Sequence, residues 1–172
     1  RNIAFRQCGK IIVASKKEQV PAVTEYIQKA NANGVDDLRW IEAGEVAELE
    51  PEVKAVGAVL SPSTGIIDSH AFMLSLQSDI EYHGGTIELL TQVIEIESSG
   101  VNRIVRTPDF ELAAQWVINS AGLWAPELAI DTPDAPRGFY AKGLYYSYSG
   151  NQPFSRLVYP VAEAGGLGVH VT

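Results

Sequence analysis

His170 is a candidate for a side chain that moves a proton. It stands between Val169 and Val171 in a short apolar stretch that is expected to be a strand. Because successive side chains of a strand point to opposite faces, the imidazole could enter a pocket while both valines pack on the other side. A histidine titrates near neutral pH and can act as a base or as a hydrogen-bond donor. A purely structural histidine is the alternative, and both readings stay open at this point.

A second group of candidates is Lys142-Gly143-Leu144-Tyr145-Tyr146, in a tyrosine-rich segment that is predicted to be a strand. It places a cation and a small residue beside phenols, a combination that could orient an anionic substrate. The competing interpretation is an exposed strand whose aromatic side chains form cross-strand pairs.

A third feature is a run of small residues, Ser120-Ala121-Gly122, that follows an apolar segment ending at Asn119. A short helix is predicted directly after it. Small residues between a strand and a helix let the backbone approach a bulky ligand at the helix N-terminus, or let the two elements pack closely. Taken by itself, the run favours the second interpretation, a plain turn.

Other kinds of chemistry find little support in the composition. The single cysteine, Cys8, excludes a disulfide framework and a Cys-rich zinc site, and the three histidines lack metal-ligand spacing. A net charge of −8 without a basic block argues against nucleic acid as a partner. No Gly-x-Ser-x-Gly elbow is present. The glycines at 165, 166 and 168 do not complete a dinucleotide motif, and a turn followed by a strand is predicted there.

Helices and strands alternate in the first half of the chain. Strands are predicted from short β-branched runs, and helices from apolar residues at helical spacing with start and stop signals. The predicted strands are Cys8–Ala14, Leu38–Ile41 and Val56–Leu60. The predicted helices are three: one from a Ser15-x-x-Glu18 capping box to Asn33-Gly34, one over Ala43–Glu50, and one from Asp68 or Ser69 to Gly84, with a buried stripe of Phe72, Met73, Leu76 and Ile80.

Strands dominate the second half. A chain that alternates helices and strands and then runs strands together indicates an α+β fold with a mixed sheet. The predicted strands are Thr86–Leu90, Gln92–Ile96, Asn102–Thr107, Ala113–Asn119, Phe139–Tyr148, Arg156–Val161 and Gly168–Val171, with a brief helix at Leu123–Ile130 and a loop at Asp131–Pro136.

The chain opens at Arg1 and ends at Thr172 within a predicted strand, so we expect a piece of a longer protein. No signal peptide and no apolar run of membrane-spanning length is visible. We expect a cytoplasmic protein and leave open a peripheral contact with a membrane. The sequence does not indicate an oligomeric state.

Five segments of the chain, taken together, resemble one known family. The sequence is similar to FAD-dependent oxidoreductases of the D-amino-acid oxidase superfamily, most of all to the branch of L-2-hydroxyglutarate dehydrogenases and oxidases. The segments follow the order found in that family, and the resemblance covers nearly the whole chain. They are Gly9–Ala14, Leu60–Asp68, Val117–Ala125, Leu157–Val161 and Gly166–Thr172.

This resemblance implies a two-domain fold. A Rossmann-like FAD domain would be assembled from discontinuous segments. A substrate domain would be built on a mixed, largely antiparallel sheet with helices on one face. Residues 1–85 and 131–172 would then belong to the substrate domain, and residues 86–130 would be an inserted segment of the FAD domain.

The resemblance also implies contacts with the cofactor. The backbone of Val93 would lie at the adenine, and the small residues Ser120, Ala121 and Gly122 would lie against the FAD. Gly143 would lie near the flavin ring. The strand–turn–helix with Gly-x-Gly-x-x-Gly that binds the FAD pyrophosphate in this superfamily is not in this chain.

For the substrate, the resemblance implies Lys142 and Tyr145 as binding residues and His170 and Tyr159 as catalytic-pocket residues. His170 would be the base or an orienting donor. Lys142 stands where the family more often has arginine, and a lysine cannot bind a carboxylate through two parallel hydrogen bonds.

The function implied for the whole protein is hydride transfer from a small 2-hydroxy acid to FAD, with the protein supplying position and electrostatics. We expect the piece alone to bind FAD weakly and to be inactive. Two alternatives stay open. One is an amino-acid or amine oxidase of the same superfamily, similar to glycine oxidase, and the other is a non-catalytic binding domain.

Overall fold

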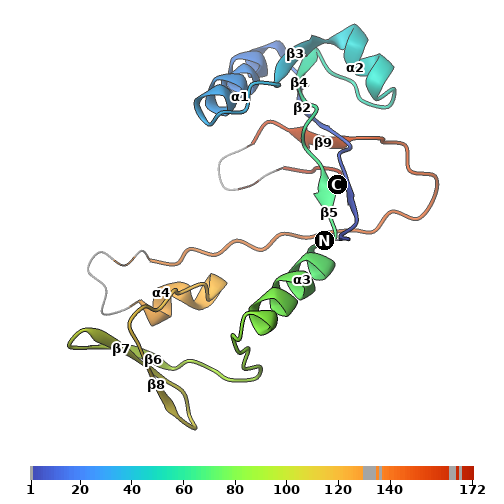
Figure 1. Cartoon of the computed structure of the whole chain (residues 1–172). Helices are drawn as coiled ribbons and strands as arrows, with labels where there is room; N and C mark the ends of the chain where they lie inside the picture. Colours follow the sequence, from blue (N-terminus) through green and yellow to red (C-terminus); the bar gives the residue numbers. More distant parts are fainter. Residues whose placement is uncertain (1, 130–134, 136, 163–165, 167) are drawn as a thin grey trace. The chain divides into compact units, whose positions relative to one another are not determined.

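The chain forms two compact units, of which the first is discontinuous in sequence. A computed structural model describes residues 2–129, 135, 137–162, 166 and 168–172 (Figure 1). The first unit comprises Arg1–Asp79 with Gly143–Thr172, and the second comprises Ile80–Lys142. That residues 86–130 belong to an FAD domain stays a prediction.

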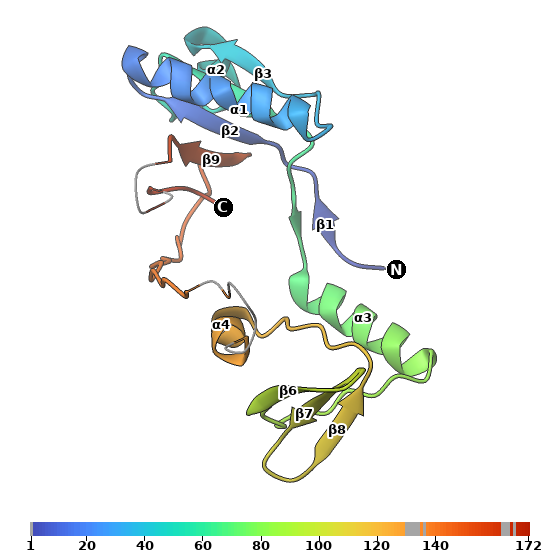
Figure 2. The ribbon, with the colours of Figure 1, turned by 90° about the vertical axis from the view of Figure 1, so that its left-hand side faces the viewer.

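A four-stranded sheet is the centre of the first unit. Its order is β3 (Arg39–Glu42), β4 (Gly57–Ser61), β2 (Lys10–Ala14) and β9 (Leu157–Pro160). β4 runs antiparallel to both β3 and β2, whereas β9 lies beside β2 in the parallel direction (Figure 2). The predicted α+β fold with a mixed, largely antiparallel sheet is confirmed.

Two helices bury the two faces of this sheet. In β2, Ile11 and Val13 join Val46 of α2 (Ala43–Leu49) in one core cluster. Ala14 joins Val23 of α1 (Val20–Ala32) in a second cluster. Because side chains alternate along a strand, the two clusters lie on opposite faces, and Figure 1 shows α1 and α2 on opposite sides of the strands. The fold class holds, but the helices are not confined to one face.

The first helix begins later than its sequence signal predicts. The side chain of Gln19, and not that of Ser15, closes the turn: it accepts hydrogen bonds from the backbone N–H groups of Ser15 and Lys16. A 3₁₀ turn, η1 (Lys17–Gln19), therefore precedes α1. Pro21 falls in the first turn of α1, where its missing N–H costs nothing.

A short ladder and a third helix follow the sheet. β1 (Phe5–Arg6) pairs with β5 (Ile66–Ile67), and α3 (Ser69–Tyr82) starts where the Asp68 carboxylate accepts a hydrogen bond from the N–H of Ala71. The start is as predicted. The prediction that this helix buries an apolar stripe is wrong, because the four side chains of the stripe are 39–55% exposed: Phe72, Met73, Leu76 and Ile80.

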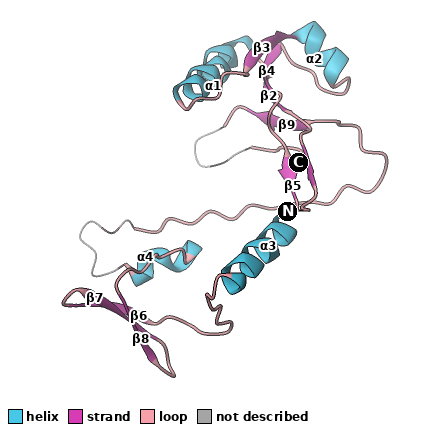
Figure 3. Ribbon diagram, in the orientation of Figure 1, coloured by secondary structure: helices cyan, strands magenta, loops and turns pink. Residues whose placement is uncertain are grey.

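The second unit contains a three-stranded antiparallel meander, which Figure 3 shows in magenta. Its strands are β6 (Glu95–Ser99), β7 (Asn102–Arg106) and β8 (Glu111–Ala114). A 3₁₀ turn, η2 (Gly122–Trp124), leads into α4 (Ala125–Leu128). The predicted strand at Thr86–Leu90 is not formed, and Leu90 has a positive φ of 57° that no strand allows.

Four further predicted strands differ from the structure. The strand predicted at Gln92–Ile96 forms later, as β6 at Glu95–Ser99. The strand predicted to reach Asn119 ends at Ala114. Phe139–Tyr148 has no regular secondary structure, and Gly168–Val171 is reduced to one bridge between Val171 and Val158. Most of the predicted loop at Asp131–Pro136, and parts of the turn at 165–168, lie outside the described residues. Among those residues, no helix is long and apolar enough to cross a membrane.

Candidate active site

The register of the chain end places His170 opposite Tyr159. Val158 of β9 and Val171 exchange two backbone hydrogen bonds, of 3.1 and 2.9 Å. In an antiparallel bridge the residues next to the pair oppose each other, so His170 and Tyr159 share the other face. Their rings stack with centroids 4.4 Å apart and an interplanar angle of 25°. Two predicted pocket residues are thus brought together by the backbone.

Tyr145 completes an aromatic cluster with them. Its ring meets the His170 ring edge-on, with centroids 6.0 Å apart. A hollow of about 630 Å³ opens beside these rings, and Tyr145 itself is 78% exposed. The segments that line it are Leu144–Tyr148, Gly150, Gln152–Phe154 and Gly168–Thr172. Exposed aromatic side chains around a hollow of this size are typical of a small-molecule site.

The tautomer of His170 follows from one hydrogen bond. Its Nδ1 lies 3.1 Å from the carbonyl oxygen of Gly168. A carbonyl oxygen only accepts, so Nδ1 carries the hydrogen and donates it. In the neutral ring Nε2 then holds the free lone pair. Within the described residues no hydrogen bond engages Nε2, so this nitrogen can accept a proton from a substrate hydroxyl.

Lys10, which was not among the predicted site residues, belongs to this cluster. Its Nζ lies over the Tyr159 ring, 5.0 Å from the centroid. Lys10 opens β2 and pairs with Leu157, two residues before Tyr159 in the parallel neighbour strand. The usable signal is a single cation in a strand whose other four residues are all apolar.

A buried carboxylate fixes the start of β9. Glu50, at the end of α2, is 1% exposed. It accepts hydrogen bonds from the backbone N–H groups of Ser155 and Arg156, at 3.1 and 2.9 Å, and from the Ser155 hydroxyl at 2.6 Å. The Arg156 guanidinium lies 3.4 Å away. Because β9 carries Tyr159, Glu50 holds the strand that presents the cluster.

The predicted cofactor residues other than Gly143 belong to the second unit. The Asn119 side chain shapes the turn: Oδ1 accepts from the Ala121 N–H at 3.2 Å, and Nδ2 donates to the Ala125 carbonyl at 2.9 Å. Gly122 adopts a left-handed φ of 57°, and a Cβ built there would meet nothing within 4 Å. A small, open turn is therefore held in place by one asparagine.

The remaining predicted residues divide between the units. Val93 precedes β6 and is half-buried, and Lys142 closes the second unit. Gly143 and Tyr145 belong to the first unit and lie in the irregular, exposed segment before residue 150.

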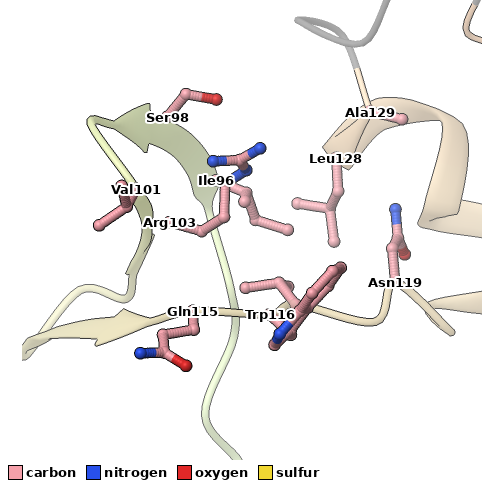
Figure 4. A pocket seen from close by; sticks show the side chains of 10 residues that line it. Ile96, Ser98, Val101, Arg103, Gln115, Trp116, Asn119, Leu128 and Ala129 are labelled. Atoms are coloured by element: carbon pink, nitrogen blue, oxygen red, sulfur yellow. The ribbon is translucent and has the colours of Figure 1, made fainter.

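A cavity of about 460 Å³ lies against the same turn in the second unit. Figure 4 shows Ile96, Trp116 and Leu128 gathered around it, with Asn119 at one edge. Its polar lining comes from Ser98, Arg103, Gln115 and Asn119. Val93, Ser120, Ala121 and Gly122 do not line this cavity.

The meander of the second unit is held by a charge cluster. Arg106 of β7 forms ion pairs with Glu95 and Glu97 of β6 and with Glu111 of β8. The hydrogen bond to Glu97, reinforced by the charges of Glu111 and Glu97, holds the pKa of Arg106 above its usual range. With three carboxylates around it, this guanidinium is not available to an anionic ligand.

Comparison with known proteins assigns the class. Residues 1–172 match the profile of the DAO family, described as FAD dependent oxidoreductase. The chain belongs to this family of flavin oxidoreductases.

Among individual proteins, it is 34% identical over 208 residues to the mitochondrial L-2-hydroxyglutarate dehydrogenase of Arabidopsis thaliana, with 99% of the chain and 43% of that protein covered. The chain spans less than half the length of the first curated relatives it matches.

Solved structures of the family share the fold. L-α-glycerophosphate oxidase from Mycoplasma pneumoniae, a structure with FAD bound, matches with a TM-score of 0.74 at 19% identity. The match covers 95% of the chain and 46% of that enzyme. Glycine oxidase from Geobacillus kaustophilus matches with a TM-score of 0.70 at 20% identity, over 92% of the chain and 44% of that enzyme.

The residues of the second unit fit FAD as one wall of its site. At Gly122 the space that a Cβ would occupy is open, and Ser120 and Ala121 beside it are small. Trp116 and Ile118, on the approach to this turn, are each 88% exposed, which leaves apolar surface for a large planar group. Ser120, Ala121 and Gly122 are the residues that would hold it there.

Proposed function

We propose that this chain is part of an enzyme that oxidises a 2-hydroxy acid of the L-2-hydroxyglutarate type to the corresponding 2-oxo acid. The observation that carries the proposal is the stacked pair of His170 and Tyr159, with the free Nε2 of His170 beside the hollow. The identity to an L-2-hydroxyglutarate dehydrogenase over nearly the whole chain supports the same substrate class.

In the proposed reaction the chain handles the proton of the substrate hydroxyl. When FAD is bound, its flavin supplies the acceptor for the hydride that leaves C2. Nε2 of His170 takes the hydroxyl proton, while Nδ1 keeps its hydrogen bond to the Gly168 carbonyl. That bond and the Tyr159 ring orient the imidazole, so Nε2 meets the substrate in a fixed direction. Tyr145 contacts the same imidazole edge-on.

The partner of the enzyme is a small molecule, and we expect no nucleic acid to bind. A cytoplasmic location, with or without contact to a membrane, stays a prediction, and the relative in Arabidopsis thaliana is a mitochondrial protein by name. The oligomeric state is left open.

The test is anaerobic reduction of the flavin in the full-length protein. L-2-hydroxyglutarate is expected to bleach the flavin absorbance, and glycine and sarcosine are expected to leave it unchanged. Bleaching by glycine or sarcosine alone would replace this proposal with an amine oxidase. A full-length protein that carries no flavin would favour a binding domain.

A further inference from the structure

We propose that Lys10 binds the substrate carboxylate remote from the oxidised carbon, and thereby selects dicarboxylates among 2-hydroxy acids. The inference deepens the proposed function and rests on it. It starts from the position of one ammonium group relative to the Tyr159 and His170 rings.

Lys10, Tyr159 and His170 form a row across one face of the sheet. Val158 packs into the core on the α2 side, so its neighbour Tyr159 faces the other side. Ile12 pairs with Tyr159 and belongs to the core cluster of α1, and Lys10 lies two residues before it on the same face. The bridge of Val158 to Val171 puts His170 on this face as well.

The spacing of this row suits the two ends of a short dicarboxylate. β2 and the segment at Val171 flank β9, and Lys10 lies a further two residues along the strand, so the backbones at Lys10 and His170 are roughly 12 Å apart. The Nζ of Lys10 then leans over Tyr159, 5.0 Å from its centroid. With the C2 hydroxyl at His170, the C1 carboxylate is one bond from C2. The far carboxylate is three carbon–carbon bonds of about 1.5 Å away, in the direction of Lys10.

Within the described residues Lys10 has no ion partner and is half-buried, whereas the other unpaired cations of the first unit are exposed: Arg6, Lys16, Lys17 and Lys54. Lys29, Arg39 and Arg156 each pair with a glutamate. In the described part of the chain no carboxylate lies within ion-pair distance of the Lys10 ammonium. A half-buried lysine without a counter-ion, over the aromatic ring that stacks on the candidate base, is suited to an anionic ligand.

The backbone before Lys10 is also fixed. Gly9 has a left-handed φ of 75°. Its N–H donates to the Thr64 carbonyl at 2.8 Å, and its carbonyl accepts from Leu157 at 3.1 Å. These bonds tie the start of β2 to β9, so the ammonium and the Tyr159 ring keep their relative position.

The test compares binding and turnover in the full-length, FAD-containing protein. Glutarate lacks the hydroxyl and cannot reduce flavin, so its affinity is measured from the change in the flavin spectrum at equilibrium. Anaerobic flavin reduction is then measured with L-2-hydroxyglutarate and with the monocarboxylate L-2-hydroxybutyrate. The variants are K10M, which keeps the length and removes the charge, K10R, which restores a charge, and K54M, which removes an exposed lysine elsewhere.

For K10M we expect at least a tenfold weaker glutarate affinity and a tenfold higher KM for L-2-hydroxyglutarate. The constants for L-2-hydroxybutyrate should change less than twofold, K10R should recover part of the glutarate affinity, and K54M should match the wild type. Equal losses for both acids, or wild-type glutarate affinity in K10M, would overturn the inference. So would a wild-type protein that does not bind glutarate. If K10M loses its flavin, K10Q is measured in its place.

These experiments distinguish a failure of the proposed function from a failure of the proposed role of Lys10. If L-2-hydroxyglutarate does not reduce the wild-type flavin, yet glutarate binds and depends on Lys10, the proposed function is wrong and the carboxylate site stands. If the wild type is reduced and K10M is indistinguishable from it, the proposed function stands and the role of Lys10 is wrong.

Discussion

The ring of Tyr159 stacks on the ring of His170 at a centroid distance of 4.4 Å, because the residues beside them, Val158 and Val171, pair through two backbone hydrogen bonds. One face of this short ladder joins the core and the other carries the rings. The pairing of Val171 with β9 therefore sets the orientation of the imidazole.

Replacing His170 with alanine should slow the reduction of the flavin by L-2-hydroxyglutarate about 100-fold, the effect expected when a general base is lost. The measurement is anaerobic stopped-flow absorbance on the full-length protein. His70, exposed at the start of α3, provides the matched control, and H70A should reduce at the wild-type rate. An unchanged rate in H170A would make His170 a structural residue.

Two substitutions of Tyr159 distinguish the role of its aromatic ring from the role of its hydroxyl group. Y159F keeps the ring that contacts both His170 and Lys10, so its reduction rate should fall less than about threefold. Y159A removes the ring, releases the imidazole and should lose more than about tenfold. Comparable losses in both variants would show that the hydroxyl matters and that the stacking does not.

Removing the buried carboxylate of Glu50 should destabilise the protein. In E50A the N–H groups of Ser155 and Arg156 and the Arg156 guanidinium lose their acceptor, at an expected cost of about 2–4 kcal/mol. Glu52, exposed two residues later, is the control, and E52A should stay within about 0.5 kcal/mol. Urea unfolding of the full-length protein measures both, and equal stabilities would mean that Glu50 does not anchor β9.

The helices and the core strands could be predicted because their signals are local. The β-branched run ending at Ala14 and the start of α3 at Asp68 depend on neighbours in sequence. The prediction of a strand at Phe139–Tyr148 was wrong, because strand formation also depends on residues far away in the sequence. Its composition suits a half-buried strand, but pairing needs a partner that composition does not specify, and the segment has none within the described residues.

The candidate site shows the same limit. The sequence pointed to His170 through its place between two valines, and to Tyr159 through the family resemblance. A lone cation in an apolar strand marks Lys10, but not its place beside Tyr159, which depends on the parallel pairing of β2 and β9 across more than a hundred residues. Glu50 stands among four other glutamates between residues 42 and 52, a pattern typical of a solvated helix face. Only the contact with Ser155 and Arg156 makes it a buried anchor.

A pair of glycine substitutions tests whether FAD lies against the small-residue turn. Gly122 and Gly34 both have a left-handed φ, of 57° and 77°, and a Cβ would meet nothing within 4 Å at either position. Alanine should therefore cost about 1 kcal/mol of backbone strain at each site. If the cofactor packs on Gly122, its new methyl group enters that contact, and G122A should bind FAD at least about tenfold more weakly than G34A. The measurement is the FAD affinity of the two variants, obtained by fluorescence titration of the deflavinated full-length protein. Equal affinities in the two variants would mean that the turn is only a connection between β8 and α4.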